Sequence, residues 1–123
     1  MDNYYIKRAR PEDSELLSNL ICELLIDFNK RSGSNFNIDK SKITTISSLL
    51  LERDNFAGFI AFNKLNNEAV GIITITQATA IYNGGDFGVI TELYVDRELR
   101  SKGLGKLLVN AAIEFARSKN WKK

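Results

Sequence analysis

Two glycines and a group of basic side chains make one short segment of this sequence a candidate binding site. Gly103 and Gly105 stand at the start of an apolar helical pattern, so the backbone there lacks Cβ atoms and its N–H groups lie at a helix N-terminus. Such N–H groups, together with the helix dipole, bind phosphate groups. Three basic residues flank the glycines: Arg100, Lys102 and Lys106. This segment therefore predicts a pyrophosphate-binding site.

The residue types that are missing exclude other chemistry. The chain has no histidine and a single cysteine, Cys22. Nucleophilic systems that depend on histidine, and zinc sites with histidine ligands, cannot be built from this chain, and one cysteine cannot form a thiolate cluster. We therefore expect no metal site. The remaining candidates for chemistry are carboxylates, tyrosines, lysines and backbone groups.

The charge of the chain is unevenly distributed. Residues 1–99 carry ten basic and fourteen acidic side chains, whereas residues 100–123 carry seven basic side chains and one acidic side chain, Glu114. A basic cluster indicates an anionic partner, although a solvated helix face has the same composition. The adjacent glycines favour a phosphate ligand, and no recognition motif for nucleic acid is evident. We expect neither a nucleic-acid partner nor a membrane partner, because no apolar run approaches the length of a membrane span.

The candidate residues must be positioned by elements that the apolar spacing predicts. One helix is expected from Pro11 to about Ser32, and a second one is capped by Asp39 and ends near Asp54. A last helix starts near Gly103. β-Prone runs predict strands at residues 4–9, 56–62, 69–76 and 87–95. Since short connections favour an antiparallel meander, the expected fold is α+β, in the order β-α-α-β-β-β-α, with a mainly antiparallel sheet flanked by helices.

The pattern Arg100-x-x-Gly103-x-Gly105 does not stand alone. It follows the strand that contains Leu93-Tyr94-Val95, and it precedes Leu107-Leu108 in an amphipathic helix. In this setting it closely resembles the acetyl-CoA motif of the GNAT superfamily of N-acyltransferases. By this resemblance, we expect the C-terminal strands of that fold to be absent from residues 1–123. We therefore interpret residues 1–123 as a single GNAT-like domain that contains the N-terminal and central part of the fold.

The resemblance implies where acetyl-CoA binds. The main chain of Leu93, Tyr94 and Val95 would pair with the pantetheine arm in the manner of an added strand. Backbone amides would hold the pyrophosphate, and these belong to Arg100, Ser101, Lys102, Gly103, Leu104, Gly105 and Lys106. Ser101 and Leu104 are named for their amides alone, so we expect their side chains to be replaceable.

Acyl transfer to an amine also needs a proton acceptor, because an amine with a pKa near 10.4 is protonated at neutral pH. Glu92 directly precedes the expected pantetheine-binding residues, and alternation places it on the same strand face as Tyr94. The family often has an acidic residue at this position, so Glu92 is the candidate base. The other interpretation is that Glu92 is a solvated carboxylate at the edge of the strand, with no catalytic role. Asp96 and Glu98 are alternatives that we expect to face solvent beside the phosphates.

The predicted function is therefore acetyl-CoA-dependent N-acetyl transfer to a small-molecule or peptide amine by direct attack. The alternative is a shortened, non-catalytic module that binds CoA or associates with itself. We expect a homo-oligomer, and exchange of strands between copies is one way to form it, because the strand at residues 87–95 has no further strand beside it in the expected sheet. A cytoplasmic protein is expected, since the N-terminus lacks a secretory pattern and one cysteine gives no disulfide framework.

Overall fold

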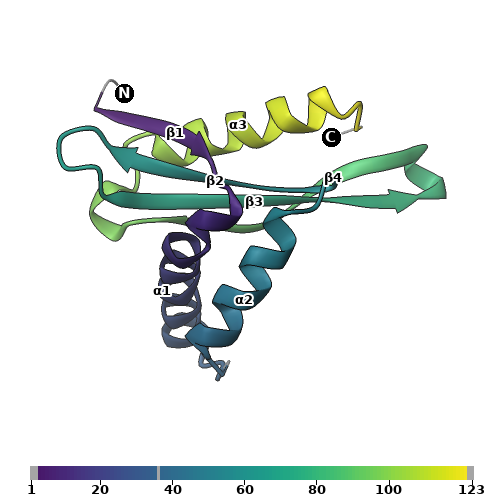
Figure 1. Cartoon of the computed structure of the whole chain (residues 1–123). Coiled ribbons are helices and arrows are strands. Elements are labelled where there is room, and N and C mark those ends of the chain that lie inside the picture. Colours follow the sequence, from purple (N-terminus) through teal and green to yellow (C-terminus); the bar gives the residue numbers. More distant parts are fainter. Residues whose placement is uncertain (1–2, 36, 122–123) are drawn as a thin grey trace.

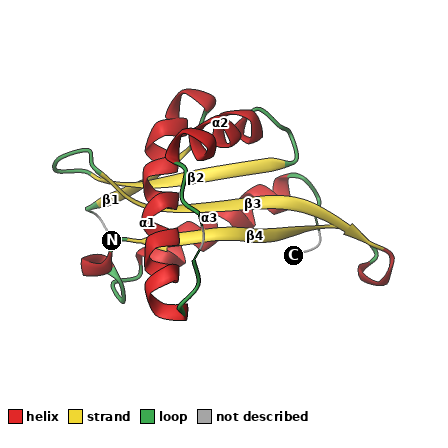
Figure 2. Ribbon diagram, turned by 90° about the horizontal axis from the view of Figure 1, so that it is seen from below, coloured by secondary structure: helices red, strands yellow, loops and turns green. Residues whose placement is uncertain are grey.

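A four-stranded antiparallel sheet forms the centre of the computed structural model, which describes residues 3–35 and 37–121. Its strands are β1 (Tyr4–Arg8), β2 (Phe56–Asn63), β3 (Ala69–Ala80) and β4 (Gly85–Val95), arranged in the order β1-β2-β3-β4. The sheet and its helices confirm the predicted α+β class and the order of the elements (Figures 1 and 2). Two of the basic residues in the C-terminal cluster, Lys122 and Lys123, lie outside the described residues.

Three helices cover the two faces of the sheet. The helices α1 (Ser14–Ser32) and α2 (Lys40–Leu51) lie on one face, and α3 (Leu104–Ser118) lies on the other (Figure 1). Asp39 caps α2 as predicted, because its Oδ1 accepts a hydrogen bond of 3.2 Å from the Lys42 N–H. The helix α2 ends at Leu51, before the predicted end near Asp54, since the chain must turn there to enter β2.

Alternation along the central strands divides the core into two apolar layers. Ile73 and Ile75 pack with α3 in one layer, whereas Ile60 and Ile72 pack with α1 in the other. Leu104 opens α3 and is only 1 % exposed in the first of these layers. The expectation that its side chain is replaceable is therefore wrong, because a truncation there would leave a cavity in the core.

A β-bulge interrupts the pairing of β3 with β4. Thr74 lies opposite Glu92, and the next residue of β3, Ile75, lies opposite Ile90, so Thr91 has no partner in the register. The extra residue reverses the alternation, because Ile90 faces α3 whereas Glu92 and Tyr94 face α1 and α2. The predicted shared face of Glu92 and Tyr94 is confirmed. The bulge beside them was not predicted.

The strands β3 and β4 form a hairpin that extends well beyond the helices (Figure 1). The strand β3 runs to Ala80, in agreement with the β-prone sequence that continues past Thr76 to Tyr82, and a short 3-10 turn at Ile81–Asn83 joins it to β4. The strand β4 lies at one edge of the sheet, as expected. Within the part of the chain that the structure describes, no helix has the length and apolar character needed to cross a membrane.

Candidate cofactor and acceptor site

The last residues of β4 present backbone groups at the open edge of the sheet. The Glu92 N–H donates to Thr74 Oγ1 at 3.0 Å, and the Asp96 N–H donates to the Val70 carbonyl at 2.8 Å, so both point toward β3. Because N–H groups alternate in direction along a strand, those of Leu93 and Val95 point away from β3. This edge can accept a further extended chain.

The segment that leads into α3 exposes a second set of backbone groups. Ser101 and Gly103 have positive φ values of 71° and 88°, and in the part of the chain that the structure describes no side chain caps the N-terminus of α3. The first amides of α3 are therefore free of a side-chain acceptor. Lys102 and Lys106 are exposed beside them, and a Cβ built at Gly105 would have no atom within 4 Å. The geometry suits an anion held by main-chain donors.

Arg100 points its side chain away from this helix N-terminus. Its Nε donates to the Val95 carbonyl at 2.8 Å, and its Nη2 donates to Asp27 Oδ2 at 2.8 Å. Asp27 lies on α1 and also accepts a hydrogen bond of 2.9 Å from Arg97. The charge of Arg100, which the sequence analysis assigned to the phosphate site, is thus paired with Asp27. Its backbone N–H donates to the Arg97 carbonyl at 3.4 Å, so this amide, unlike the first amides of α3, already has a partner.

Asp27 connects α1 to the β4–α3 segment, and its titration should make that connection sensitive to acid. Hydrogen bonds from Arg100 and Arg97 lower the pKa of the Asp27 carboxyl below its ordinary value of 3.8. A group whose pKa is lower in the folded state stabilises the fold above its unfolded pKa, and this stabilisation is lost as the pH falls through the folded pKa.

We therefore expect Asp27→Asn to lower the free energy of unfolding at pH 7 and to weaken its decline below about pH 4. Urea unfolding at several pH values between 2.5 and 7 measures both effects. Glu114→Gln is the control, because Glu114 forms an exposed pair with Arg117 at 2.9 Å within one helix. Equal pH dependence for wild type and Asp27→Asn would contradict the assigned role of Asp27.

Glu92 is fixed in place by hydroxyl groups at the bulge. Its Oε1 accepts hydrogen bonds from Thr74 Oγ1 and, at 3.0 Å, from Thr91 Oγ1. The two hydroxyl oxygens lie 2.7 Å apart, and Thr74 is fully buried. Thr74 also accepts the Glu92 N–H, so one side chain holds both the backbone and the carboxylate of Glu92. Sequence reasoning missed Thr74, because a threonine in a strand is ordinary.

Glu92 and Thr74 line a cavity of about 240 Å³ between the sheet and the helices α1 and α2. Eight of the remaining lining residues are apolar: Leu17, Ile21, Leu24, Leu25, Ile43, Ile46, Leu50 and Phe56. The carboxylate therefore lies at the wall of a mainly apolar space. A side chain in this position can hold an ammonium group or accept a proton from it.

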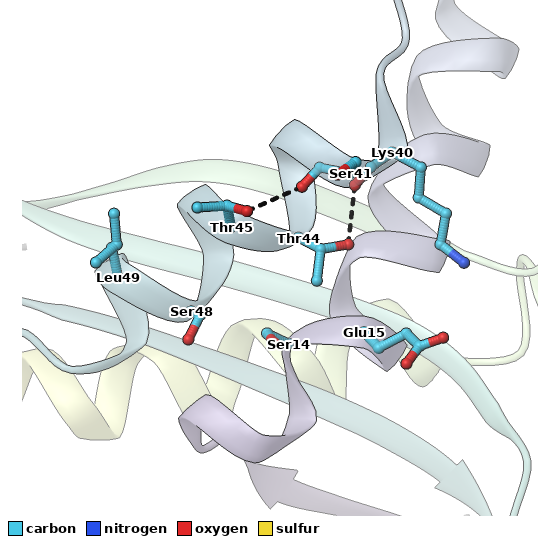
Figure 3. Close-up of a pocket in the computed structure, with 8 residues that line it drawn as sticks. All are labelled: Ser14, Glu15, Lys40, Ser41, Thr44, Thr45, Ser48 and Leu49. Carbon is cyan, nitrogen blue, oxygen red and sulfur yellow. Dashed lines mark hydrogen bonds between the residues drawn. The ribbon is translucent and has the colours of Figure 1, made fainter.

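A larger groove of about 660 Å³ lies between α1 and α2 and is shown in Figure 3. Its lining residues all belong to these two helices, and many carry hydroxyl groups. The hydroxyls of Thr44 and Thr45 donate to the carbonyls of Lys40 and Ser41 at 2.8 and 3.1 Å. Thr44 Oγ1 also lies within hydrogen-bond distance of Ser18 Oγ on α1, at 2.7 Å. Because these hydroxyls are already hydrogen-bonded within the helix pair and lie apart from the bulge, we place the candidate site at Glu92 and not in this groove.

The alternative carboxylates differ from one another in exposure. Glu98 is exposed, as expected. Asp96 is half-buried, and burial raises the pKa of its carboxyl, with further contributions from Glu23 and Glu98. Asp96 therefore faces solvent only in part. Both residues lie away from the cavity that contains Glu92.

Comparison with known proteins defines the class of this fold and site. The family model for the GNAT acetyltransferases matches residues 21–123. This match takes in most of the chain, so the protein belongs to the GNAT family of acetyltransferases. The family resemblance seen in the motif around Gly103 and Gly105 is thereby confirmed.

Solved structures agree with this assignment. An aminoglycoside acetyltransferase from an uncultured soil metagenomic sample, in complex with trehalose, is 27 % identical with a TM-score of 0.76, and the match covers 98 % of this chain and 74 % of that one. Its complex with sisomicin gives 27 % identity, a TM-score of 0.74 and the same coverage. A predicted acetyltransferase from Clostridium acetobutylicum, solved with acetyl-CoA, is 22 % identical with a TM-score of 0.81, and the match covers 98 % of this chain and 77 % of that one.

Proposed function

We propose that this chain transfers an acetyl group from acetyl-CoA to the nitrogen of an amine by direct attack, with Glu92 as the proton acceptor. The observation that carries the proposal is the β4 bulge. It turns Glu92 into the cavity under α1 and α2, and the open-edge amides of Leu93 and Val95 follow immediately in the chain. A carboxylate and an edge that can hold an extended cofactor arm therefore adjoin one another.

The donor in this proposal is acetyl-CoA, which supplies an activated acetyl group as a thioester. Its pantetheine arm would lie along Leu93, Tyr94 and Val95, and its pyrophosphate would lie against the amides between Arg100 and Lys106. Two features support the fit. Among the described residues, no strand pairs with the outer edge of β4, although the Val95 carbonyl there accepts a hydrogen bond from Arg100, and no side chain caps the N-terminus of α3. A protein of the same fold is known with acetyl-CoA.

The residues of this chain would act on the proton and on the carbonyl group. Glu92 takes one proton from the bound ammonium, and the neutral nitrogen then forms a bond to the acetyl carbon as the carbon–sulfur bond breaks. CoA leaves as a thiolate, which takes up the second proton that the nitrogen loses on becoming an amide. An amide N–H at the open edge of β4 would polarise the carbonyl oxygen. Cys22 lies on α1, and burial raises the pKa of its thiol, so a covalent acetyl-cysteine step has no support.

The acceptor is proposed to be a small-molecule amine, with a peptide amine as the other possibility. Related structures are aminoglycoside acetyltransferases, one of them in complex with sisomicin. Thiol release from acetyl-CoA, measured across a panel of amines that includes sisomicin, tests the proposal. We expect release that depends on the amine. Binding of CoA without any release would favour the non-catalytic module instead.

Self-association is the other property that the structure suggests. The open edge of β4 adjoins an apolar groove of about 430 Å³ against α3, whose lining includes Ile90, Ile113 and Trp121. Unpaired strand edges and apolar patches both favour association. We propose that the 123-residue chain forms homo-oligomers through this face, by pairing or exchange of the part of β4 next to Ile90, so that the edge at Leu93–Val95 stays open to the pantetheine arm.

Sedimentation of the 123-residue chain over a concentration series should therefore show a dimer or a larger species. Ile113→Lys should shift the distribution toward monomer, because Ile113 is 41 % exposed and lines the groove. The control is Leu65→Lys, at an apolar residue that is 87 % exposed in the β2–β3 turn. A monomer at every concentration would contradict the proposal.

A further inference from the structure

On the basis of the proposed function, we propose that the cavity beside Glu92 selects a primary amine carried on an apolar body, such as an alkyl chain or a single ring. The substrate class follows from the chemistry of the walls. Apolar side chains from both α1 and α2 surround one carboxylate, and the sheet contributes Phe56 to the same space. Such walls favour a ligand with one charged end and an apolar remainder.

The volume of the cavity sets the size of that apolar body. An apolar cavity of about 150 Å³ accommodates benzene. The cavity here measures about 240 Å³, which leaves room for a ring with a short linker or for a chain of about six to eight carbon atoms. Ile46 lines the cavity and is 46 % exposed, so the space opens toward solvent beside α2.

The charge at the wall fits a single ammonium group. Thr74 and Thr91 both donate to Oε1 of Glu92, and among the described residues none donates to Oε2. One carboxylate oxygen therefore orients the side chain, and the other is left for a ligand. Within residues 3–35 and 37–121, no second carboxylate lines the cavity, so a polyamine would have to place its further ammonium groups against apolar walls, which is costly.

A homologous series of amines tests this selection directly. Calorimetric titration without acetyl-CoA measures binding separately from turnover. The full chain is titrated with propylamine, butylamine, hexylamine and octylamine. Each added methylene should raise the affinity about fourfold until the cavity is filled. 1,6-Diaminohexane has the same chain length as hexylamine with a second charge, so it should bind at least about tenfold more weakly.

Two exposed apolar residues of α2 provide a matched pair of variants. Ile46→Asn alters the cavity beside Glu92, whereas Leu49→Asn alters the larger groove between α1 and α2 that Figure 3 shows, where Leu49 is 60 % exposed. We expect Ile46→Asn to weaken hexylamine binding about tenfold, equivalent to the loss of roughly two methylene contacts, and Leu49→Asn to leave it unchanged. Because both side chains are partly exposed, both variants should fold.

The outcomes separate this inference from the proposed function. Affinity that does not depend on chain length, equal binding of the diamine, or equal effects of the two asparagine variants would overturn the inference. Thiol release with sisomicin but not with hexylamine would also overturn it and would leave the proposed function intact. Chain-length-dependent binding without thiol release from any amine would support the cavity assignment and overturn the proposed acetyl transfer.

Discussion

Glu92→Gln should lower the rate of thiol release at pH 7 by about a hundredfold, the cost typical of losing a general base. The amine arrives protonated, because its pKa lies near 10.4, and glutamine cannot take the proton. Part of the loss should be recovered as the pH rises toward 10, since the amine then loses its proton to solvent. Measurement of kcat between pH 6.5 and 10 at saturating acetyl-CoA and amine tests both effects.

The contacts of Glu92 supply the companion variants for this experiment. Thr74→Val keeps the carboxylate but removes the buried hydroxyl that holds it, so kcat should fall less than in Glu92→Gln and KM for acetyl-CoA should be unchanged. Thr79→Val is the matched control, because Thr79 bonds to Asp86 at 2.8 Å across the same two strands. An unchanged pH–rate profile for Glu92→Gln would make Glu92 a structural carboxylate, which is the alternative interpretation.

Local spacing was sufficient to predict the elements. The positions of α1, α2 and α3 follow from apolar residues that recur at helical spacing, and the cap at Asp39 follows from a preference that operates within one turn. The antiparallel meander follows from the short connections between β2, β3 and β4. In each case the interactions that decide the structure lie within a few residues of one another.

The parts of the site that were missed depend on pairing between distant residues. Between the pairs Thr74–Glu92 and Ile75–Ile90, β4 has one residue more than β3, and this extra residue forms the bulge. The sequence of one strand alone does not reveal how it pairs with the other. The pairing of Arg100 with Asp27 joins residues 73 positions apart, through the packing of α1 beside the end of β4. The basic residues near Gly103 therefore looked equivalent in the sequence, although the guanidinium of one of them, Arg100, is directed to Asp27 in the fold.

The face of Glu92 was nevertheless predicted correctly, for a reason that lies in the position of the bulge. The extra residue precedes Glu92, so regular alternation holds from Glu92 through Tyr94 and both side chains face α1 and α2. If regular alternation is continued back from Glu92, Ile90 is placed on the face of α1 and α2, whereas in the structure Ile90 faces α3. The chemistry of the site thus depends on a backbone irregularity one residue away from the candidate base.

The glycine segment offers the sharpest test of the proposed CoA site. Gly105→Val should weaken CoA binding about ten- to a hundredfold, because a hydrogen bond to a charged group contributes about 1.5–3 kcal/mol and a branched side chain would crowd the amides that make it. The fold should tolerate the change. A Cβ at Gly105 meets no atom within 4 Å, and valine is a better helix former than glycine.

Gly105 is a cleaner position for this test than Gly103, whose positive φ of 88° would make any larger side chain strained in the folded protein. Asn110→Val is the matched control, since Asn110 is exposed on the same helix. Calorimetric titration of CoA against wild type and both variants, with their unfolding curves compared, gives the result. If Gly105→Val folds and binds CoA as tightly as wild type and Asn110→Val, the pyrophosphate does not lie at the N-terminus of α3.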